Sequence, residues 1–311
     1  MVNYDYNLII HTRKVSAEKL QQGKLLGKGI KPMKRILTIQ DISCVGKCSL
    51  TIALPVISAM GVECAVLPTA LLSNHTMFKS FTFDDLSDQI SPIMECWKNE
   101  GITFDAIYTG YLGSVQDIDL VKKLIADFSN DETLVFIDPV MADNGKLYSN
   151  FDDTYVKANT SLCAAADVIV PNLTEACLLT DTPYREDMTI DEKKELLLKL
   201  CSLGSKTSVL TGVSMEEGKT GVLGFDSEKK EFFSVQSEHI DASFHGTGDI
   251  FSSVTVGALM NGLSWEQSLQ IAADYTGATI KATLEDPKKP WYGVNFEQTI
   301  PQLINMLRDA G

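Results

Sequence analysis

Features of membrane, nucleic-acid-binding and secreted proteins are scarce in this sequence. Its 311 residues include 27 Lys and Arg against 41 Asp and Glu, a formal net charge of −14, and so acidic a chain is unsuited to nucleic acid or an anionic membrane. The seven cysteines are odd in number and include no CxxC pair, which is typical of reduced thiols rather than of disulfides. We therefore expect a cytoplasmic protein that binds neither nucleic acid nor a membrane.

Long uninterrupted apolar segments are also missing. The longest apolar run, residues 51–72, contains two prolines, a glycine and a glutamate, so a buried helix followed by a buried strand fits it better than a membrane span. Residues 1–32 contain Lys and Arg but not the apolar core of a secretory signal. Because strand-like patterning begins only after residue 33, we expect 1–32 to be a dispensable or non-native extension and Met33 to be the natural start.

Two familiar nucleotide-binding motifs are absent as well. Residues 212–220 end like a P-loop, but the first glycine lies one residue too early, and a strand pattern follows where a helix is needed. No GxGxxG segment follows a predicted strand, so a nicotinamide-dependent dehydrogenase has little support. If this acidic chain binds a polyphosphate, backbone dipoles and a bound cation must offset the charge of that ligand.

What the sequence does contain is a regular alternation of short apolar runs and helical stretches from Arg35 onward. Repeated strand–helix–strand units with almost continuously apolar strands predict an α/β fold, a mostly parallel sheet with helices on both faces. Strand patterns at 220–225 and 231–235, joined by a polar turn, predict an antiparallel hairpin at the sheet edge. Since no repeat or linker is visible, we interpret residues 33–311 as a single domain.

The predicted strands are 35–41, 62–71, 105–112, 133–140, 167–170 and 208–213. The predicted helices are 48–60, 84–99, 115–128, 152–165, 174–179, 189–203, one that begins near 246, one after the capping box at 264–267, and 296–308. Ligands of such sheets bind beyond the carboxyl ends of the parallel strands, so polar residues at those ends should gather at one edge. These residues are Asp41, Ser73 to Thr76, Thr109 to Tyr111, Asp138, Asn172 and Thr211-Gly212.

The strongest single motif is Gly246-Thr247-Gly248-Asp249 at the start of a long predicted helix. Glycines let the backbone turn tightly, and the free N–H groups at the positive end of the helix dipole form an anion site without a basic side chain. Asp249 could take a proton from an attacking hydroxyl group, which would complete the minimum equipment of a phosphotransferase. The alternative is an ordinary glycine turn with Asp249 capping the helix.

Two acidic segments follow predicted strands. Asp138 and Asp143 are either ordinary turn residues or carboxylates that hold Mg²⁺ near phosphates through water. Asn172 and Glu175 have the spacing of a helix N-cap and its N3 partner, which is a complete structural explanation. The functional alternative places Glu175 on the Mg²⁺ side of the site.

A polar loop and a tyrosine complete the set of candidates. The loop from Ser73 to Thr76 and the ring of Tyr111 are either a common polar turn and a tyrosine covering the core edge, or the binding site of a flat heteroaromatic substrate. His75 is a weaker candidate base than Asp249, because only Asp249 lies beside the predicted anion site.

Together these motifs resemble the ribokinase-like small-molecule kinases, and within them the pyridoxal kinase branch. The resemblance rests on GTGD at 246–249 and on the segments SNHT, TGYLGS, DPVM and PNLTE, and it runs from Arg35 to the last helix. It implies a ribokinase-like fold and ATP-dependent phosphorylation of the 5′-hydroxymethyl group of pyridoxal, pyridoxine or pyridoxamine. It also implies Mg²⁺, often a monovalent cation such as K⁺, and a homodimer.

The resemblance assigns roles by position. Asp249 would be the base, and Gly246, Thr247 and Gly248 the anion hole. The residues expected around ATP are Asp138, Asp143, Asn172, Glu175, Thr211 and Gly212. Asp138 and Glu175 would hold Mg²⁺, partly through water. The residues expected around the vitamer are Asp41, Ser73, His75, Thr76 and Tyr111.

The sequence departs from this branch on the substrate side. Asp41-Ile42 stands where the branch commonly has Ser-His, and Leu72 where an aromatic residue is common. A carboxylate facing the ring could favour the amine of pyridoxamine or change the protonation of the ring nitrogen. A hydroxymethylpyrimidine or sugar kinase is therefore the alternative within the same chemistry, although Tyr111 favours a flat ring. A vitamin-binding or regulatory protein without turnover is the alternative of another class.

Overall fold

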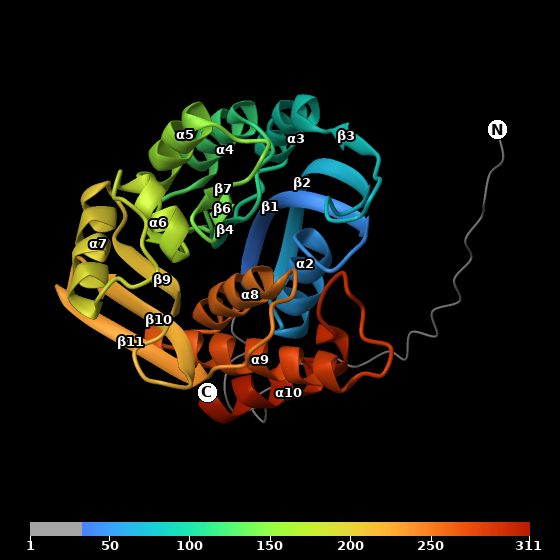
Figure 1. Ribbon diagram of the computed structural model, residues 1–311. Helices are drawn as coiled ribbons and strands as arrows, with labels where there is room; N and C mark the ends of the chain where they lie inside the picture. The colour runs from blue at the N-terminus through green and yellow to red at the C-terminus, as the bar shows by residue number, and fades with distance from the viewer. Residues whose placement is uncertain (1–32) are drawn as a thin grey trace, which may run out of the picture. The chain divides into compact units, whose positions relative to one another are not determined.

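A nine-stranded sheet is the framework of the computed structural model, which describes residues 33–311. The strands are β1 (Arg35–Val45), β2 (Glu63–Asn74), β3 (Phe83–Asp85), β4 (Ala106–Thr109), β5 (Leu134–Ile137), β8 (Val168–Ile169), β9 (Thr207–Val213), β10 (Lys219–Asp226) and β11 (Glu231–Glu238). Their order in the sheet is β11-β10-β9-β8-β5-β4-β1-β2-β3 (Figure 1). The strands from β9 to β2 pair in parallel, and antiparallel strands occupy both edges. The predicted parallel sheet and its edge hairpin, β10–β11, are confirmed.

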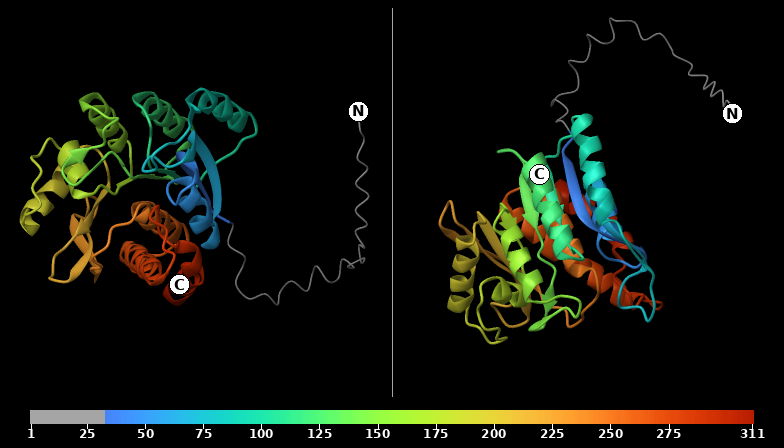
Figure 2. Two further views of the ribbon diagram at one scale, coloured as in Figure 1. Left: turned by 45° about the vertical axis from the view of Figure 1, so that its right-hand side comes forward. Right: turned by 90° about the horizontal axis from the view of Figure 1, so that it is seen from above.

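Helices cover both faces of this sheet. They are α2 (Leu50–Ala59), α3 (Ser87–Asn99), α4 (Val115–Phe128), α5 (Asp153–Cys163), α6 (Leu173–Leu179), α7 (Ile190–Ser202), α8 (Thr247–Met260), α9 (Trp265–Glu285) and α10 (Phe296–Ala310). The apolar side chains of α3 to α7 pack in one core, and those of α2, α8, α9 and α10 pack in the cores on the other face (Figures 1 and 2). The predicted helices are therefore confirmed, within a few residues at their ends.

The two cores follow from the alternation of side chains along each strand. On β1, Ile36 belongs to the core beneath α2 and α8, whereas Leu37 belongs to the core beneath α3 and α4. On β4, Ile107 and Tyr108 divide in the same way. Because successive side chains point to opposite faces, a strand covered on both sides must be apolar throughout, which is the pattern seen in the sequence.

Three short strands were not predicted. The expected helix at 84–99 begins only at Ser87, because Phe83–Asp85 pairs with β2 as β3 and the Asp85 carboxylate accepts the Ser87 N–H at 2.8 Å. A hairpin of β6 (Ala142–Asp143) and β7 (Lys146–Leu147) follows β5. Its turn, Asn144-Gly145, has φ of 52° and 74°, the positive values that a two-residue hairpin turn requires.

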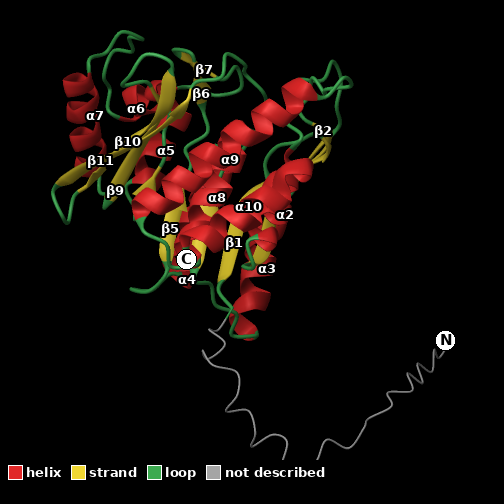
Figure 3. Cartoon of the chain, turned by 90° about the horizontal axis from the view of Figure 1, so that it is seen from below, coloured by secondary structure: helices red, strands yellow, loops and turns green. Residues whose placement is uncertain are grey.

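The β6–β7 hairpin lies beside α6 (Figure 3). The backbone N–H of Gly145 donates a 2.9 Å hydrogen bond to the hydroxyl group of Thr174, in the first turn of α6. The segment after β5 is thereby fixed against the helix that follows β8. The hydrogen bond thus connects the segments that follow the carboxyl ends of these two strands.

Two further expectations, that the cysteines are reduced and that the chain has no membrane span, can be compared with residues 33–311. All seven cysteines lie in the described part of the chain and are unpaired. Among residues 33–311 no helix combines the length and the apolar character needed to cross a membrane. The expectation that 1–32 is an extension lies outside the described residues.

Candidate active site

The N-terminus of α8 has the backbone geometry that the glycine motif predicts. Gly246 is its N-cap with φ of 87°, and a Cβ at that position would lie 2.1 Å from the carbonyl oxygen of Lys47. The first hydrogen bond within the helix is donated by Ile250 to the Gly246 carbonyl, at 3.0 Å. The N–H groups of residues 247–249 therefore have no carbonyl partner within the helix, which makes them available to an anion.

Asp249 lies in the first turn of α8 but does not cap it. No side chain makes a cap hydrogen bond to this helix. The pKa of Asp249 is raised to about 7, mainly by burial; the backbone of Ser49 opposes this shift, and the charges of Asp138 and Asp41 add to it. The alternative that Asp249 merely caps the helix is wrong. A carboxyl group with a pKa near neutrality is suited to proton transfer.

Asp138 connects the central strands to the same helix. It follows β5 directly, and its Oδ2 accepts a 2.7 Å hydrogen bond from the hydroxyl group of Ser252. Ser252 is three residues after Asp249, so the two side chains share one face of α8. The end of β5 and the first turn of α8 are thus held together.

Glu175 is 3% exposed and is surrounded by backbone donors. Its Oε1 accepts the N–H of Met141 at 2.9 Å, and its Oε2 accepts the N–H of Asn172 at 2.9 Å. Asn172 accepts the N–H of Glu175 in return, at 2.9 Å, and donates to the carbonyl oxygen of Ala142 at 2.8 Å. The predicted capping box is confirmed, and the amide group of Asn172 is used within the protein.

These carboxylates lie in a region short of positive charge. Burial raises the pKa of Asp138 and of Glu175, with the negative charge of Glu175 adding to the effect at Asp138. None of the ion pairs among residues 33–311 includes Asp41, Asp138, Glu175 or Asp249. Buried carboxylates without basic partners are a fitting environment for a divalent cation, which prefers oxygen ligands.

The protein side chains alone do not form a closed metal cage. In the described part of the chain no three His, Cys, Asp or Glu residues are grouped closely enough to hold a metal ion. Mg²⁺ typically keeps several waters and binds through one or two carboxylates together with substrate phosphates. The donor set of Asp138 and Glu175 fits this open type of site.

Asp41 lies on the substrate side of the predicted site, where the register of β1 against β2 shifts between Gln40 and Ile42. Its carboxylate accepts hydrogen bonds from the hydroxyl groups of Ser49, at 2.6 Å, and Ser43, at 3.3 Å. Burial is the main reason that its pKa is raised.

Tyr111 lies within the electrostatic range of Asp41. Burial raises the pKa of Tyr111 first, and the charge of Asp41 contributes to the same shift. The Tyr111 hydroxyl group accepts a 2.8 Å hydrogen bond from the amide of Asn150. The effect of the Asp41 charge on the pKa values of both Tyr111 and Asp249 supports the predicted grouping of these three residues, whose contacts with a substrate stay predictions.

His75 is 3% exposed and holds the loop after β2 in place. Its Nδ1 accepts the N–H of Met77 at 3.3 Å, so the proton is on Nε2, which donates to the carbonyl oxygen of Tyr292 at 2.9 Å. Its ring is 4.5 Å from that of His245, and burial followed by the charge of His75 lowers the pKa of His245 to about 4. With both ring nitrogens engaged, His75 is not arranged as a base.

The neighbouring loop residues Ser73 and Thr76 differ from His75 in their contacts and exposure. The hydroxyl oxygen of Ser73 accepts the N–H of Thr82 at 2.9 Å, and its hydrogen is donated to Asn74 Oδ1 at 2.9 Å. Thr76 is exposed. Substrate contacts of Ser73, His75 and Thr76 stay predictions.

The remaining residues predicted to bind ATP are at the rim of the sheet. The Thr211 hydroxyl group donates to the Pro171 carbonyl oxygen at 3.3 Å, and Gly212 is exposed with φ of 69°. Asp143 is exposed at the tip of the β6–β7 hairpin, where it accepts the N–H of Asn144 at 2.9 Å. Their contacts with a nucleotide also stay predictions.

Ser49 and Ser252 are functional candidates that the sequence interpretation missed. Ser252 could have been found from its position three residues after Asp249 on the same helix face. Ser49 carries a misleading signal, because a serine before an apolar run predicts a helix N-cap. It is the N-cap of α2, yet its hydroxyl group donates to Asp41.

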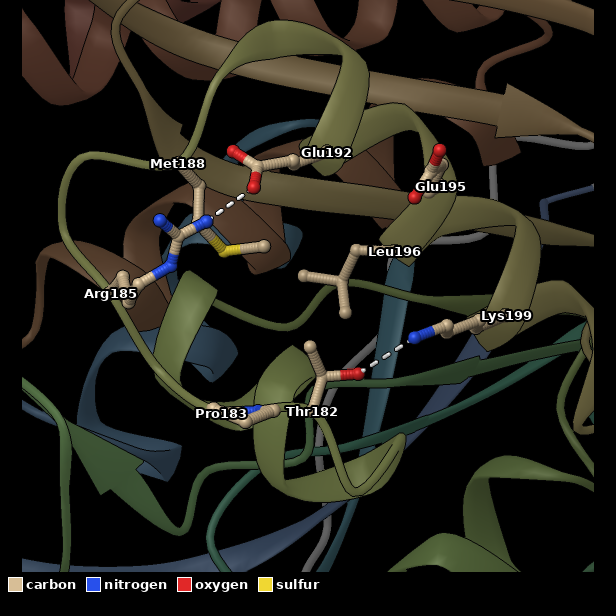
Figure 4. A pocket seen from close by; sticks show the side chains of 8 residues that line it. All are labelled: Thr182, Pro183, Arg185, Met188, Glu192, Glu195, Leu196 and Lys199. Carbon is tan, nitrogen blue, oxygen red and sulfur yellow. Dashed lines mark hydrogen bonds and ion pairs between the residues drawn. The ribbon is translucent and has the colours of Figure 1, made fainter.

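A surface pocket elsewhere in the chain is distinct from this set (Figure 4). Its lining residues come from α7 and the segment before it, and none of them is a predicted site residue. They are Thr182, Pro183, Arg185, Met188, Glu192, Glu195, Leu196 and Lys199. Arg185 is paired with Glu192, and Lys199 donates to the Thr182 hydroxyl group at 3.2 Å, so both basic side chains of the pocket are already engaged.

A ribokinase-like α/β fold, an open helix N-terminus and a carboxyl group of near-neutral pKa beside it define a small-molecule kinase. Comparison with known proteins gives the family. Residues 53–290 match the model of the phosphomethylpyrimidine kinase family, and the chain belongs to that family.

Relatives within this family include kinases of B6 vitamers. The pyridoxine kinase of Bacillus subtilis is 31% identical over 210 residues, which are 67% of this chain and 73% of that protein. The structure of pyridoxal kinase from Lactobacillus plantarum is 30% identical with a TM-score of 0.82, covering 89% of this chain and 98% of that one. A Bacteroides thetaiotaomicron protein solved with pyridoxal is 40% identical with a TM-score of 0.83, covering 87% and 96%. The predicted resemblance to pyridoxal kinases is confirmed.

We expect Gly246→Ala to destabilise the protein, because alanine would need an unfavourable positive φ and would overlap the Lys47 carbonyl oxygen. The expected loss is ~2–4 kcal/mol of unfolding free energy. Gly248→Ala is the matched control, since a Cβ there meets nothing within 4 Å; it should be neutral or stabilise by up to ~1 kcal/mol. Urea unfolding followed by circular dichroism compares the two variants, and equal losses would contradict the prediction.

The raised pKa of Asp249 predicts a pH-dependent stability. The folded protein keeps this proton to about pH 7, whereas the unfolded chain loses it near the ordinary pKa of aspartate, 3.8, so stability falls as the pH rises between these values. Asp249→Asn should therefore raise the Tm of the ligand-free protein at pH 8 and change it little at pH 4. Calorimetry at both values tests this, with the exposed Asp187→Asn as control. A gain in Tm that is equal at both values would refute it.

Proposed function

We propose that the protein transfers the γ-phosphoryl group of ATP to the 5′-hydroxymethyl group of a B6 vitamer: pyridoxal, pyridoxine or pyridoxamine. The observation that carries this proposal is the Asp249 carboxyl group, with its raised pKa, at the open N-terminus of α8. Membership of a kinase family supports the reaction. The pyridoxine kinase of B. subtilis and the structure solved with pyridoxal support the choice of substrate.

Asp249 accepts the proton of the substrate hydroxyl group as its oxygen attacks the γ-phosphorus. The N–H groups at the start of α8, from Gly246 to Gly248, stabilise the negative charge on the phosphoryl oxygens during transfer. No basic side chain is needed for this step, since backbone donors at a helix N-terminus bind anions on their own.

Asp138 and Glu175 would hold Mg²⁺, partly through water, and the ion would neutralise charge on the phosphates of ATP. Their burial without a basic partner supports this assignment. The other residues proposed around ATP are Asp143, Asn172, Thr211 and Gly212. The resemblance to pyridoxal kinases also leads us to propose a monovalent cation such as K⁺.

The vitamer is proposed to lie between Asp41 and the ring of Tyr111, next to the loop that carries Ser73, His75 and Thr76. A buried carboxylate facing the ring favours a substrate with a cationic group, such as the amine of pyridoxamine. Phosphorylation of a hydroxymethylpyrimidine is the second candidate, because the matching family model is described as phosphomethylpyrimidine kinase. We also propose a cytoplasmic location, which the seven unpaired thiols support.

The first experiment is coupled ADP release with Mg-ATP against the three vitamers, hydroxymethylpyrimidine and ribose. We expect turnover on at least one vitamer, with Asp249→Asn reducing kcat at least ~100-fold because the general base is lost. Circular dichroism of the variant controls for folding. Near-normal turnover in Asp249→Asn would refute the assignment of the base.

Turnover on the pyrimidine or ribose alone would keep the mechanism and overturn the substrate. Binding of a vitamer without any turnover would instead support the alternative of a vitamin-binding protein.

We further propose a homodimer that forms through the β2–β3 edge of the sheet. Leu71, Phe81 and Phe83 are 41%, 43% and 54% exposed there, and β3 is an edge strand whose outer backbone groups have no partner strand among the described residues. Apolar side chains beside an open edge are typical of an association surface.

Light scattering coupled to size exclusion should give twice the mass of the chain for the wild type. Phe83→Asp should give the mass of a monomer, whereas Phe232→Asp, an exposed position on β11 at the opposite edge, should not change the mass. A wild-type monomer at micromolar concentration would refute the dimer.

A further inference from the structure

Ser49 contacts a carboxylate of the candidate active site. It is 5% exposed, and its hydroxyl group donates a 2.6 Å hydrogen bond to Asp41 Oδ1. The loop that carries Ser49 also packs against the start of α8, since a Cβ on Gly246 would lie 2.1 Å from the Lys47 carbonyl oxygen. Ser49 thus contacts the carboxylate proposed to face the substrate ring, and its loop contacts the helix that carries the proposed base.

The side chain of Ser49 does not have the role that is usual at its position. Ser49 is the N-cap of α2, but it makes no side-chain cap hydrogen bond. Its backbone has φ of 48° and ψ of −131°, a combination that glycine adopts more readily than serine. Neither helix capping nor backbone preference therefore accounts for a serine at this position. The hydrogen bond from its hydroxyl group to Asp41 does account for it.

Asp41 depends on hydroxyl donors for its hydrogen bonds. The part of the chain that the structure describes offers it no ion pair, and its Oδ2 accepts only a longer bond, 3.3 Å, from Ser43. Hydrogen bonds to a charged group are stronger than those between neutral groups. The short bond from Ser49 is therefore the main restraint on the orientation of this carboxylate.

We propose that Ser49 is a positioning residue that fixes the orientation of Asp41 relative to the start of α8, which carries Asp249. Its hydroxyl group orients Asp41, so that a substrate held at Asp41 presents its hydroxyl group to the base. Ser49 itself exchanges no proton in the reaction. This inference rests on the proposed function and assigns to it a residue that determines how the substrate is aligned.

Ser49→Ala and Ser49→Gly test the hydroxyl group, since both retain the backbone N–H. We expect the KM for pyridoxamine to rise ~10-fold or more in both, the loss typical of a hydrogen bond to a charged group, while kcat changes less than ~3-fold. Glycine also relieves the backbone strain, so a wild-type KM in Ser49→Gly would overturn the proposal. Ser205→Ala, a buried serine bonded to Ser208 at 3.0 Å, is the control and should leave both constants unchanged.

A double-mutant cycle with Asp41→Asn separates positioning from general destabilisation. In the Asp41→Asn background, Ser49→Ala should change KM less than ~3-fold, because the contact that it removes has already lost its charged partner. A change as large as that in the wild type would mean that Ser49 acts independently of Asp41, and would overturn the inference.

The same double-mutant cycle, measured by urea unfolding of the ligand-free protein, tests the contact between Ser49 and Asp41 without relying on the proposed function. Ser49→Ala should lower the urea midpoint at least twice as much in the wild type as in the Asp41→Asn background. If this coupling is present while the wild type phosphorylates no B6 vitamer, the proposed function fails and the link between Ser49 and Asp41 stands. Additive effects on the urea midpoint would overturn the link itself.

Discussion

Electrostatic repulsion among buried carboxylates is the constraint on which the candidate site depends. The fold places Asp41, Asp138, Glu175 and Asp249 in one region, and burial raises the pKa of each. Hydroxyl and backbone donors offset part of the cost: Ser49 at Asp41, Ser252 at Asp138 and two loop N–H groups at Glu175. The four carboxylates still lack a positively charged partner. A ligand that brings a cation would offset their mutual repulsion, and because it binds the folded state it would stabilise the protein.

The parallel sheet explains why these groups meet, and the packing of α8 explains why they are held. Asp138 follows a central strand, while Asp249 is delivered by a helix whose N-cap, Gly246, is in van der Waals reach of the Lys47 carbonyl. The connection between β1 and α2 and the start of α8 are therefore built as one unit. Lys47 directs its amino group away from the carboxylates, to Asn295 at 3.1 Å and Glu297 at 2.7 Å. The amino group of Lys47 is thus already paired, and it does not neutralise the buried carboxylates of the candidate site.

Local signals in the sequence were sufficient for most of the fold and for the local geometry of two parts of the candidate site. The positive φ of Gly246, the capping box of Asn172 and Glu175, and the parallel pairing of the central strands all follow from residue type and spacing. Strand β3 could not be predicted, because its three residues form a strand only by pairing with β2. The role of Ser49 was hidden for a similar reason. Its partner, Asp41, precedes it by 8 positions on a different element, and nothing in the residue type indicates a glycine-like backbone conformation.

The arrangement also connects the choice of substrate to the state of the base. The negative charge of Asp41 contributes to the raised pKa of Asp249. On the proposed function, a cationic group bound at Asp41 would neutralise that contribution and lower the pKa of Asp249, which favours the ionised form of the proposed base when such a substrate is present. A neutral ring would not have this effect and would leave more of Asp249 protonated. On the proposed function, Asp41 in place of the commoner serine therefore acts on the rate of proton transfer as well as on affinity.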